Sequence, residues 1–221
     1  MAPEARIRVL IVDDHLALAE GLQALLSRQP DLELTEVATD RRTAMRIAAE
    51  REPHVVVMDQ NLSGDSGVNV AAAIFRAGIK TSVVMFSGGM TQDELVAAVE
   101  AGVSGYLMKT TPVAEIVDAI RRAASGDMLL PRMELDALLR QGRERARQRA
   151  DRPGSVPQLT PREREVLALM AQANDVQKIA ERLGISVNTA RGYVQQVLEK
   201  LGAHSRLEAV VRANELGLLG A

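Results

Sequence analysis

His54-Val55-Val56-Val57-Met58-Asp59 is the stretch of sequence that decides the fold. Four apolar residues, three of them β-branched, lead directly into a carboxylate, and Glu52-Pro53 comes before them. A short, uninterrupted apolar run of this kind indicates a strand that is buried on both faces of a parallel sheet. Open α/β sheets place their ligand sites beyond the carboxyl ends of such strands. Asp59 is therefore a candidate functional residue.

A strand with the same pattern begins the chain. Residues 7–12 are rich in β-branched residues and lead into Asp13 and Asp14. If this strand lies beside the Asp59 strand in a parallel sheet, three carboxylates meet at one edge and raise each other's pKa. Such an oxygen-rich site suits Mg²⁺, which takes one or two carboxylates and keeps several waters. One aspartate alone would be an ordinary turn residue, but three at matching strand ends favour a metal site.

Composition describes a globular protein of one or two domains. Of the 221 residues, 47% are hydrophobic and 25% are charged,. The absence of cysteine excludes disulfides and thiolate metal sites, and it fits a reducing cytoplasm,. The sequence has no apolar run as long as a membrane span and no signal-peptide character at residues 1–5,. We therefore expect a cytoplasmic protein without a membrane partner.

Charge is distributed unevenly along the chain. Residues 1–130 hold 12 Lys and Arg against 18 Asp and Glu. Residues 131–157 hold 7 against 4, and residues 158–221 hold 8 against 7. An acidic half joined to a mildly basic remainder predicts domains with different partners.

Strand and helix patterns alternate through residues 1–125, which we predict to be one domain. The predicted strands are 7–12, 32–38, 54–59, 81–86 and 104–108. Helical patterns follow them at 15–28, 40–51, 66–77, 91–100 and from Thr111-Pro112 onward,. This alternation predicts a doubly wound α/β fold with the flavodoxin-like strand order 2-1-3-4-5.

That strand order would bring Ser87 and Lys109 to the edge that holds the aspartates. A carboxylate such as Asp59 can attack a phosphoryl group and form an acyl phosphate. Mg²⁺ held by the aspartates and the backbone carbonyl of Asn61 would neutralise the transferring oxygens. Lys109 would add a point charge and Ser87 a hydrogen bond. Ser87 alone could be a strand-end cap and Lys109 alone a solvated lysine, but their combination favours function.

Residues 6–125 resemble the receiver domain of two-component response regulators. The matching pieces are Val12–His15, Met58-Asp59, Phe86–Gly88 and Gly105–Lys109. The resemblance implies that Asp59 accepts phosphate from a sensor histidine kinase while Asp13 and Asp14 hold Mg²⁺. It also implies that Ser87 and Tyr106 form a switch. One departure is Ser63, which stands where the family usually has proline and is expected to loosen the loop slightly.

Residues 126–157 have a different composition. Leu135, Leu138 and Leu139 predict one or two helical turns, whereas Arg140–Arg152 is rich in arginine and poor in apolar residues. The following Pro153-Gly154 is typical of a hinge. We therefore predict a basic, flexible, partly helical linker. Its charge could contact DNA phosphates or the acidic first domain, but a solvated tether is the favoured interpretation.

Residues 158–221 predict a small all-α domain of four helices. Thr160-Pro161-Arg162-Glu163 is a capping box, and later helices are predicted at 175–183, at 186–201 and from Ser205,. Residues 178–186 have the pattern of a helix-turn-helix, with a small residue in the first helix and glycine in the turn. Polar residues on the third helix are candidates for base or phosphate contacts, namely Asn188, Thr189, Arg191, Gln195 and Gln196,.

Residues 159–219 resemble a LuxR-type helix-turn-helix domain, with the signature LTPREREVL at residues 159–167. A receiver followed by this domain characterises the NarL/FixJ class of response regulators. The resemblance implies base contacts at Arg191, Gly192 and Gln195, with Thr189 near phosphate. Gly192 has no side chain and Gln195 stands where lysine is common, so a dimer would be needed to supply DNA affinity.

The sequence thus predicts a regulator rather than an enzyme. Phosphorylation of Asp59 would shift a two-state equilibrium, free the DNA-binding domain and favour homodimers on double-stranded DNA. One alternative is a phosphatase with Asp59 as nucleophile, but such enzymes commonly place a second acid two residues later, where this chain has Asn61. Another alternative is an interaction-only regulator that does not bind DNA.

Overall fold

The computed structural model describes residues 6–148 and 157–219, and it describes no side chains at residues 145–148. The chain divides into two compact units, residues 1–129 and residues 130–221. We describe each unit by itself. Among the described residues, no helix is both long and apolar enough to cross a membrane.

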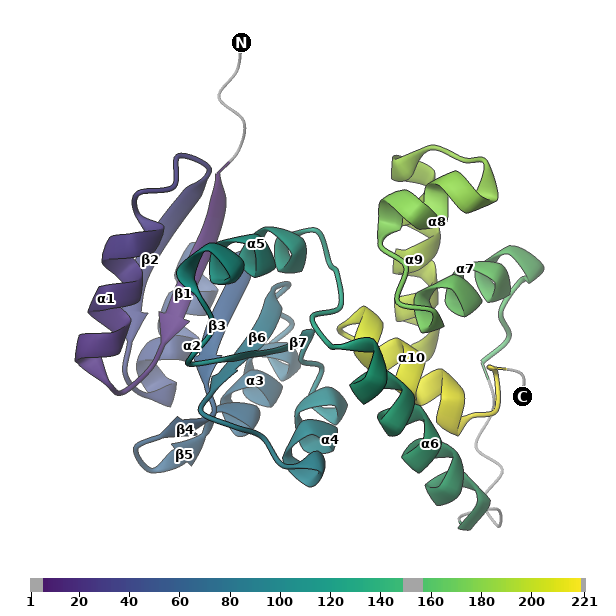
Figure 1. Ribbon diagram of the computed structural model, residues 1–221, viewed down its shortest axis with the longest axis horizontal. Coiled ribbons are helices and arrows are strands. Elements are labelled where there is room, and N and C mark those ends of the chain that lie inside the picture. Colours follow the sequence, from purple (N-terminus) through teal and green to yellow (C-terminus); the bar gives the residue numbers. More distant parts are fainter. Residues whose placement is uncertain (1–5, 149–156, 220–221) are drawn as a thin grey trace. The chain divides into compact units, whose positions relative to one another are not determined.

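The first unit is built on a five-stranded parallel sheet with the order β2-β1-β3-β6-β7 (Figure 1). Its strands are β1 (Ile7–Val12), β2 (Leu32–Ala38), β3 (Val55–Asp59), β6 (Ser82–Ser87) and β7 (Gly105–Met108). This order confirms the flavodoxin-like topology that the alternating pattern predicted. Because all strands are parallel, the residues that follow them come to one edge of the sheet.

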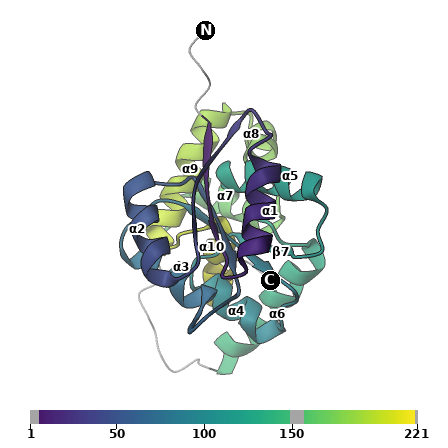
Figure 2. The ribbon, with the colours of Figure 1, turned by 90° about the vertical axis from the view of Figure 1, so that its left-hand side faces the viewer.

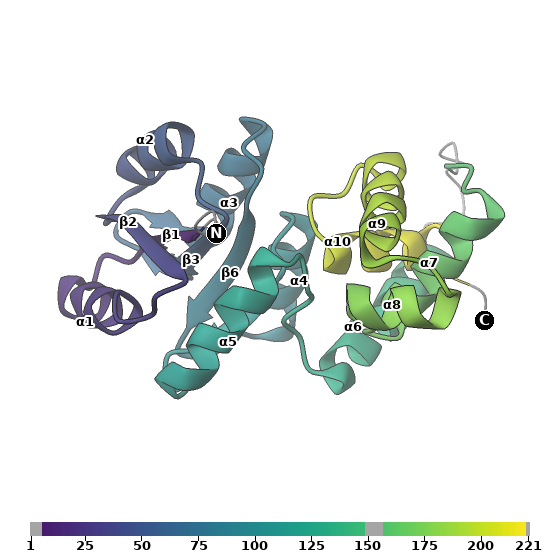
Figure 3. The ribbon, with the colours of Figure 1, turned by 90° about the horizontal axis from the view of Figure 1, so that it is seen from above.

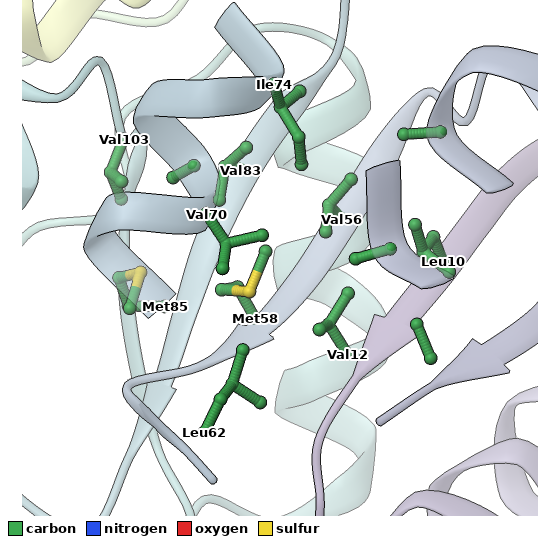
Figure 4. Packing of buried hydrophobic residues seen from close by; sticks show 14 of the residues in the cluster. Leu10, Val12, Val56, Met58, Leu62, Val70, Ile74, Val83, Met85 and Val103 are labelled. Carbon is green, nitrogen blue, oxygen red and sulfur yellow. The ribbon is translucent and has the colours of Figure 1, made fainter. Parts of the chain in front are cut away.

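Helices cover both faces of the sheet. They are α1 (Leu16–Leu26), α2 (Arg41–Arg51), α3 (Gly67–Arg76), α4 (Gln92–Glu100) and α5 (Val113–Ala124). Helices α2 and α3 lie on one face, and α1 and α5 lie on the other (Figures 2 and 3). Two apolar clusters fill the spaces between, so the β-branched strands are buried on both sides. Figure 4 shows one cluster, where Val12, Met58 and Val70 meet.

Local signals in the sequence begin two of these helices. The Asp40 side chain accepts a hydrogen bond from the Thr43 backbone N–H and caps α2. Thr91 and Glu94 form the complete capping box that their spacing predicted for α4. Such caps satisfy backbone N–H groups that have no partner within the helix. They explain why these helices begin where the sequence predicts.

A short hairpin that the sequence pattern did not predict follows the Asp59 strand. Strand β4 (Asn61–Leu62) pairs with β5 (Asp65–Ser66), and α3 then begins at Gly67. A β-carbon at Gly67 would lie 1.9 Å from the Asp59 carbonyl oxygen. Only glycine allows the chain to pass so close. Gly67 therefore determines how tightly the hairpin folds back against the end of β3.

The second unit consists of helices. They are α6 (Arg132–Gln148), α7 (Pro161–Ala171), α8 (Val176–Leu183), α9 (Val187–Leu201) and α10 (Arg206–Glu215). The last four are the predicted four-helix domain, and α8 and α9 form its helix-turn-helix. Gly184 ends α8 with a left-handed backbone at φ 62°, and the Ser186 side chain accepts from the Thr189 N–H to begin α9. The tight turn thus depends on the glycine and the polar cap that the sequence identified.

Helix α6 is longer than the one or two turns that the sequence predicted, and it packs against α10 (Figure 1). Leu135 and Leu138 are buried. The Asn214 side chain on α10 donates to the Leu139 carbonyl at 2.8 Å and accepts from Arg143 at 3.2 Å. The expectation of a solvated tether therefore does not hold for Arg143, which this hydrogen bond joins to α10. The side chains of the arginine-rich residues 145–156 lie outside the described residues, so the hinge there stays a prediction.

Candidate phosphoacceptor site

Acidic side chains gather at the carboxyl edge of the sheet, as the strand order predicted. Asp13 directly follows β1, and Asp59 ends the neighbouring strand β3. Their side chains are buried, with exposed fractions of 1% and 2%. The Lys109 ammonium, just beyond β7, lies 2.9 Å from Asp59 Oδ2 and 3.1 Å from Asp13 Oδ2. Lysine thus joins the two buried carboxylates directly. An ammonium between two carboxylates reduces the repulsion that would otherwise oppose their ionisation.

His15 contributes a nitrogen to the same cluster, a role that no pattern in the sequence predicted. Its ring Nδ1 lies 3.0 Å from Asp14 Oδ1 and 3.7 Å from Asp59 Oδ2. Its backbone N–H donates to Asp13 Oδ1 at 2.8 Å. The ring itself is largely exposed. The position of His15 directly after Asp13 and Asp14 could have predicted this. The first residues of a loop that follows a strand lie at the same edge of the sheet.

The environment shifts the pKa of three groups in opposite ways. Burial raises the pKa of the Asp59 carboxyl, the nearby Lys109 opposes this rise, and the Asp13 charge adds to it. The Ser63 hydroxyl holds the pKa of Asp14 below its usual value. Burial alone would lower the pKa of Lys109, but hydrogen bonds to Asp59 and Asp13 outweigh it and leave that pKa raised. Lys109 is therefore charged. The buried Asp59 carboxylate beside it is unfavourable without such a positive partner.

The cluster fits a hard divalent cation. Asp13, Asp14, His15 and Asp59 each offer a ligand atom, and these atoms lie within 4.8 Å of one another. Asp14 Oδ1 and Asp59 Oδ2 are buried and accept no well-aligned hydrogen bond from the described residues. Carboxylate oxygens are preferred ligands of Mg²⁺, and the nitrogens that already lie beside these two are Lys109 Nζ at Asp59 Oδ2 and His15 Nδ1 at Asp14 Oδ1. The Asn61 N–H lies 3.4 Å from Asp59 Oδ1, while a metal contact by the Asn61 carbonyl stays a prediction.

Ser63 acts differently from what we expected of it. Its backbone N–H donates to Asp14 Oδ2 at 2.8 Å, and its hydroxyl donates to the same oxygen. A proline at this position would offer neither donor. The serine therefore ties the loop to Asp14 instead of loosening it. The hydroxyl of Ser63 was the signal in the sequence. We had considered only that proline is absent at this position.

The two predicted switch residues lie on neighbouring strands. Ser87 ends β6, is 1% exposed, and accepts from the Gly89 N–H at 3.0 Å. Its hydroxyl is within donating distance of the Gly89 carbonyl, at 2.7 Å, and of the Gln60 side-chain oxygen. Tyr106 lies on β7 and is partly buried against the apolar cluster beneath α3 and α4. Their role in switching stays a prediction, and Gln60 is a neighbour that the sequence analysis did not identify.

The six candidate DNA-contacting residues all lie exposed on α9. The opposite side of the helix is buried through Ala190, Val194, Val197 and Leu201, as its spacing predicted. Arg191 donates to the Asn188 side chain at 3.2 Å, and Gln195 donates to Glu199 at 3.0 Å. A polar, exposed face on the second helix of a helix-turn-helix has the geometry that enters a major groove. Contact with DNA by the individual residues stays a prediction.

A lysine near the end of α9 serves the fold instead. The Lys200 ammonium lies 2.7 Å from the Glu163 carboxylate, which is buried at the start of α7. The same carboxylate accepts from the Thr160 N–H in the predicted capping box. This ion pair joins α9 to α7. Lys200 is thus engaged in an ion pair within the domain. Arg191 supplies positive charge to the exposed face near the start of α9.

Comparisons with known proteins agree with both units. Residues 9–121 match the response regulator receiver domain family, and residues 157–213 match the bacterial regulatory proteins of the luxR family. The transcriptional regulatory protein LiaR of Bacillus subtilis (strain 168) is 34% identical over 210 residues, which cover 94% of this chain and 97% of LiaR. The nitrate/nitrite response regulator NarL of Escherichia coli (strain K12) is 30% identical over 211 residues, covering 96% of each chain.

A solved structure shares the fold of the first unit. The signal receiver domain of the NarL response regulator from Mycobacterium tuberculosis matches with a TM-score of 0.54 and 28% identity. The match covers 56% of this chain and 99% of that domain. Together with the family matches and the two relatives, it confirms the resemblance that the motifs indicated. The chain belongs to the NarL/FixJ class of response regulators, in which a receiver domain is joined to a LuxR-type DNA-binding domain that regulates transcription.

Proposed function

We propose that this response regulator receives a phosphoryl group on Asp59 from a sensor histidine kinase and binds promoter DNA in a phosphorylation-dependent way. The observation that carries the proposal is the contact of 2.9 Å between Lys109 Nζ and Asp59 Oδ2 inside a cluster with Asp13 and Asp14. A buried carboxylate with a cation beside it is a suitable nucleophile for phosphorus.

Each group has a defined part in the transfer. An Asp59 oxygen forms a bond to phosphorus while the bond from phosphorus to the kinase's histidine nitrogen breaks, and that nitrogen keeps the electron pair. Lys109 neutralises charge on the phosphoryl oxygens, and Ser87 donates a hydrogen bond to one of them. Asp13, Asp14, Asp59 and the Asn61 carbonyl would hold Mg²⁺, which when bound supplies further positive charge to the same oxygens.

The DNA-binding part of the proposal depends on the exposed face of α9. Thr189, Arg191 and Gln195 offer a hydroxyl, a guanidinium and an amide there. Since one such face carries few positive charges, we propose that phosphorylated homodimers place two of them on paired half-sites of double-stranded DNA. A regulator of this kind acts where the DNA is, so we place it in the cytoplasm.

The test compares wild type with Asp59→Ala after incubation with acetyl phosphate and Mg²⁺. We expect the wild-type mass alone to rise by one phosphoryl group of about 80 Da, with a shift to dimer. Tighter binding to genomic DNA fragments in gel-shift titrations should accompany that shift. An adduct on both proteins, or on neither, would contradict Asp59 as the acceptor.

The same sample separates the alternatives. A phosphatase would release inorganic phosphate from acetyl phosphate in many turnovers per chain, whereas a phosphoacceptor retains it as an adduct. An interaction-only regulator would gain the adduct without any change in DNA affinity. Either result would replace the corresponding part of the proposal.

A further inference from the structure

Gln60 connects the candidate switch hydroxyl to the first turn of α4. It follows Asp59 directly and is 6% exposed. Its side-chain oxygen accepts from the Ser87 hydroxyl, and its side chain lies beside the Glu94 carboxylate, whose pKa the Thr91 donors and then Gln60 lower. Glu94 in turn accepts from the Thr91 N–H at 2.7 Å in the capping box of α4. These contacts thus lead from the edge of the sheet to the start of a helix.

These partners determine which way the Gln60 amide points. A carboxylate can only accept, so the amide NH₂ must face Glu94. The amide oxygen then faces Ser87, whose hydroxyl can donate to it. The opposite orientation would place the amide oxygen against the carboxylate, where two acceptors repel each other. The Glu94 carboxylate therefore sets the orientation of the amide.

The Ser87 hydroxyl has a single proton, and several acceptors compete for it. In this structure the Gln60 oxygen and the Gly89 carbonyl are within reach of it. If the hydroxyl donates to a phosphoryl oxygen on Asp59, it can no longer donate to Gln60. The buried Gln60 oxygen then loses its hydrogen-bond partner. This is unfavourable, because the free energy of removing that oxygen from water is no longer offset.

We propose that Gln60 is a positioning residue that retains the Ser87 hydroxyl until Asp59 is phosphorylated and transmits its release to α4 through Glu94. This inference rests on the proposed function of Asp59. When Ser87 leaves, the amide turns to find a new partner, and its bond to Glu94 breaks. The first turn of α4 then depends on the Thr91–Glu94 capping box alone.

The test uses full-length protein with Gln60→Met, which keeps the length of the side chain and removes both hydrogen bonds. Gln92→Met is the matched control, because Gln92 is exposed on the same helix that Glu94 caps. Phosphorylation by acetyl phosphate forms a bond from Asp59 to phosphorus as the bond from phosphorus to acetate breaks. We measure its rate by intact mass, and we follow amide hydrogen exchange of residues 91–96 with and without acetyl phosphate.

Loss of one restraining hydrogen bond should raise the phosphorylation rate of Gln60→Met about threefold to tenfold. Without acetyl phosphate, residues 91–96 of this variant should already exchange as fast as in phosphorylated wild type. In a Ser87→Ala background, Gln60→Met should leave the rate unchanged, because the restrained hydroxyl is gone. A purely structural role for Gln60 would not remove its effect in that background.

Glu94→Ala provides a second variant, for which only the phosphorylation rate is compared, because the substitution also removes the capping box of α4. It should raise the rate less than Gln60→Met, because Gln60 stays but loses one of its two partners. If wild type is phosphorylated while Gln60→Met matches Gln92→Met in both rate and exchange, the inference on Gln60 is wrong. If wild type gains no phosphoryl group at all, the proposed function itself fails.

Discussion

Asp14 Oδ2 accepts two hydrogen bonds from Ser63, one from its hydroxyl and one at 2.8 Å from its backbone N–H. These bonds favour the ionised carboxylate, and they hold its pKa below the usual value. Asp14 is also a candidate ligand of Mg²⁺. Ser63 therefore orients and keeps charged a group that the metal would need.

Replacing Ser63 with alanine removes the hydroxyl and keeps the backbone donor. We expect a loss of about 1 kcal/mol in the free energy of unfolding at pH 7, since Asp14 is partly exposed and its hydrogen bonds are screened. The folded-state pKa of Asp14 is depressed, so this contribution is present above its ordinary value of 3.8 and is lost as pH falls through the lower folded value,. Urea unfolding at pH 7 and in acid measures the difference. A loss of the same size at both pH values would contradict the link to Asp14.

Replacing Asp59 with asparagine should stabilise the first unit at neutral pH. Burial raises the pKa of Asp59, so its ionised form opposes folding above the unfolded pKa, and the variant removes that cost. The gain should fade as pH falls below the unfolded pKa, where the wild-type carboxyl is neutral in both states.

Thermal unfolding over a pH series, without Mg²⁺, checks the effect of Asp59→Asn. Asp93→Asn is the control, because it changes the same charge at an exposed position. Adding Mg²⁺ should stabilise wild type more than Asp59→Asn, because a ligand that binds only the folded state stabilises it. Equal shifts in both proteins would argue against Asp59 as a metal ligand.

Leu135 tests whether α6 belongs to the packed second unit. It is 1% exposed, so Leu135→Ala should lower the free energy of unfolding of that unit by about 2 to 4 kcal/mol,. Met133, on the same helix, is 84% exposed, and Met133→Ala should change stability by less than about 0.5 kcal/mol,. Urea unfolding, followed by circular dichroism at a helical wavelength, measures both. Two equal, negligible effects would mean that the segment behaves as a tether in solution.

Arg191 tests the DNA-binding face of α9. Arg191→Ala should weaken binding of a preferred DNA fragment about tenfold or more, because it removes a charge and a donor from the exposed face. Arg28→Ala, an equal change of charge on an exposed residue of the first unit, should have no such effect. Titrations over a series of salt concentrations separate two roles: a phosphate contact lowers the salt slope by about one, whereas a base contact reduces sequence preference.

Much of the fold is a local property of the sequence. The apolar run that ends at Asp59 can be satisfied only inside a parallel sheet, and the capping boxes at Thr91 and Thr160 begin helices through neighbouring residues,. Parallel strands bring their carboxyl ends to one edge, so Asp13, Asp59 and Lys109 follow from strand order alone. The periodicity of apolar residues and the capping motifs involve residues that are close together in the chain. A single sequence therefore shows them directly.

Tertiary structure decided the partners that lie far apart in the chain. The bond of Ser63 to Asp14, the contact of Gln60 with Ser87, and the packing of α6 on α10 each join residues whose local sequence gives no sign of the other. Such pairings depend on how a loop returns across the edge of a sheet or which helix covers an apolar stripe. The sequence by itself therefore determined the elements and the charged edge, while packing determined which neutral side chains hold that edge in place.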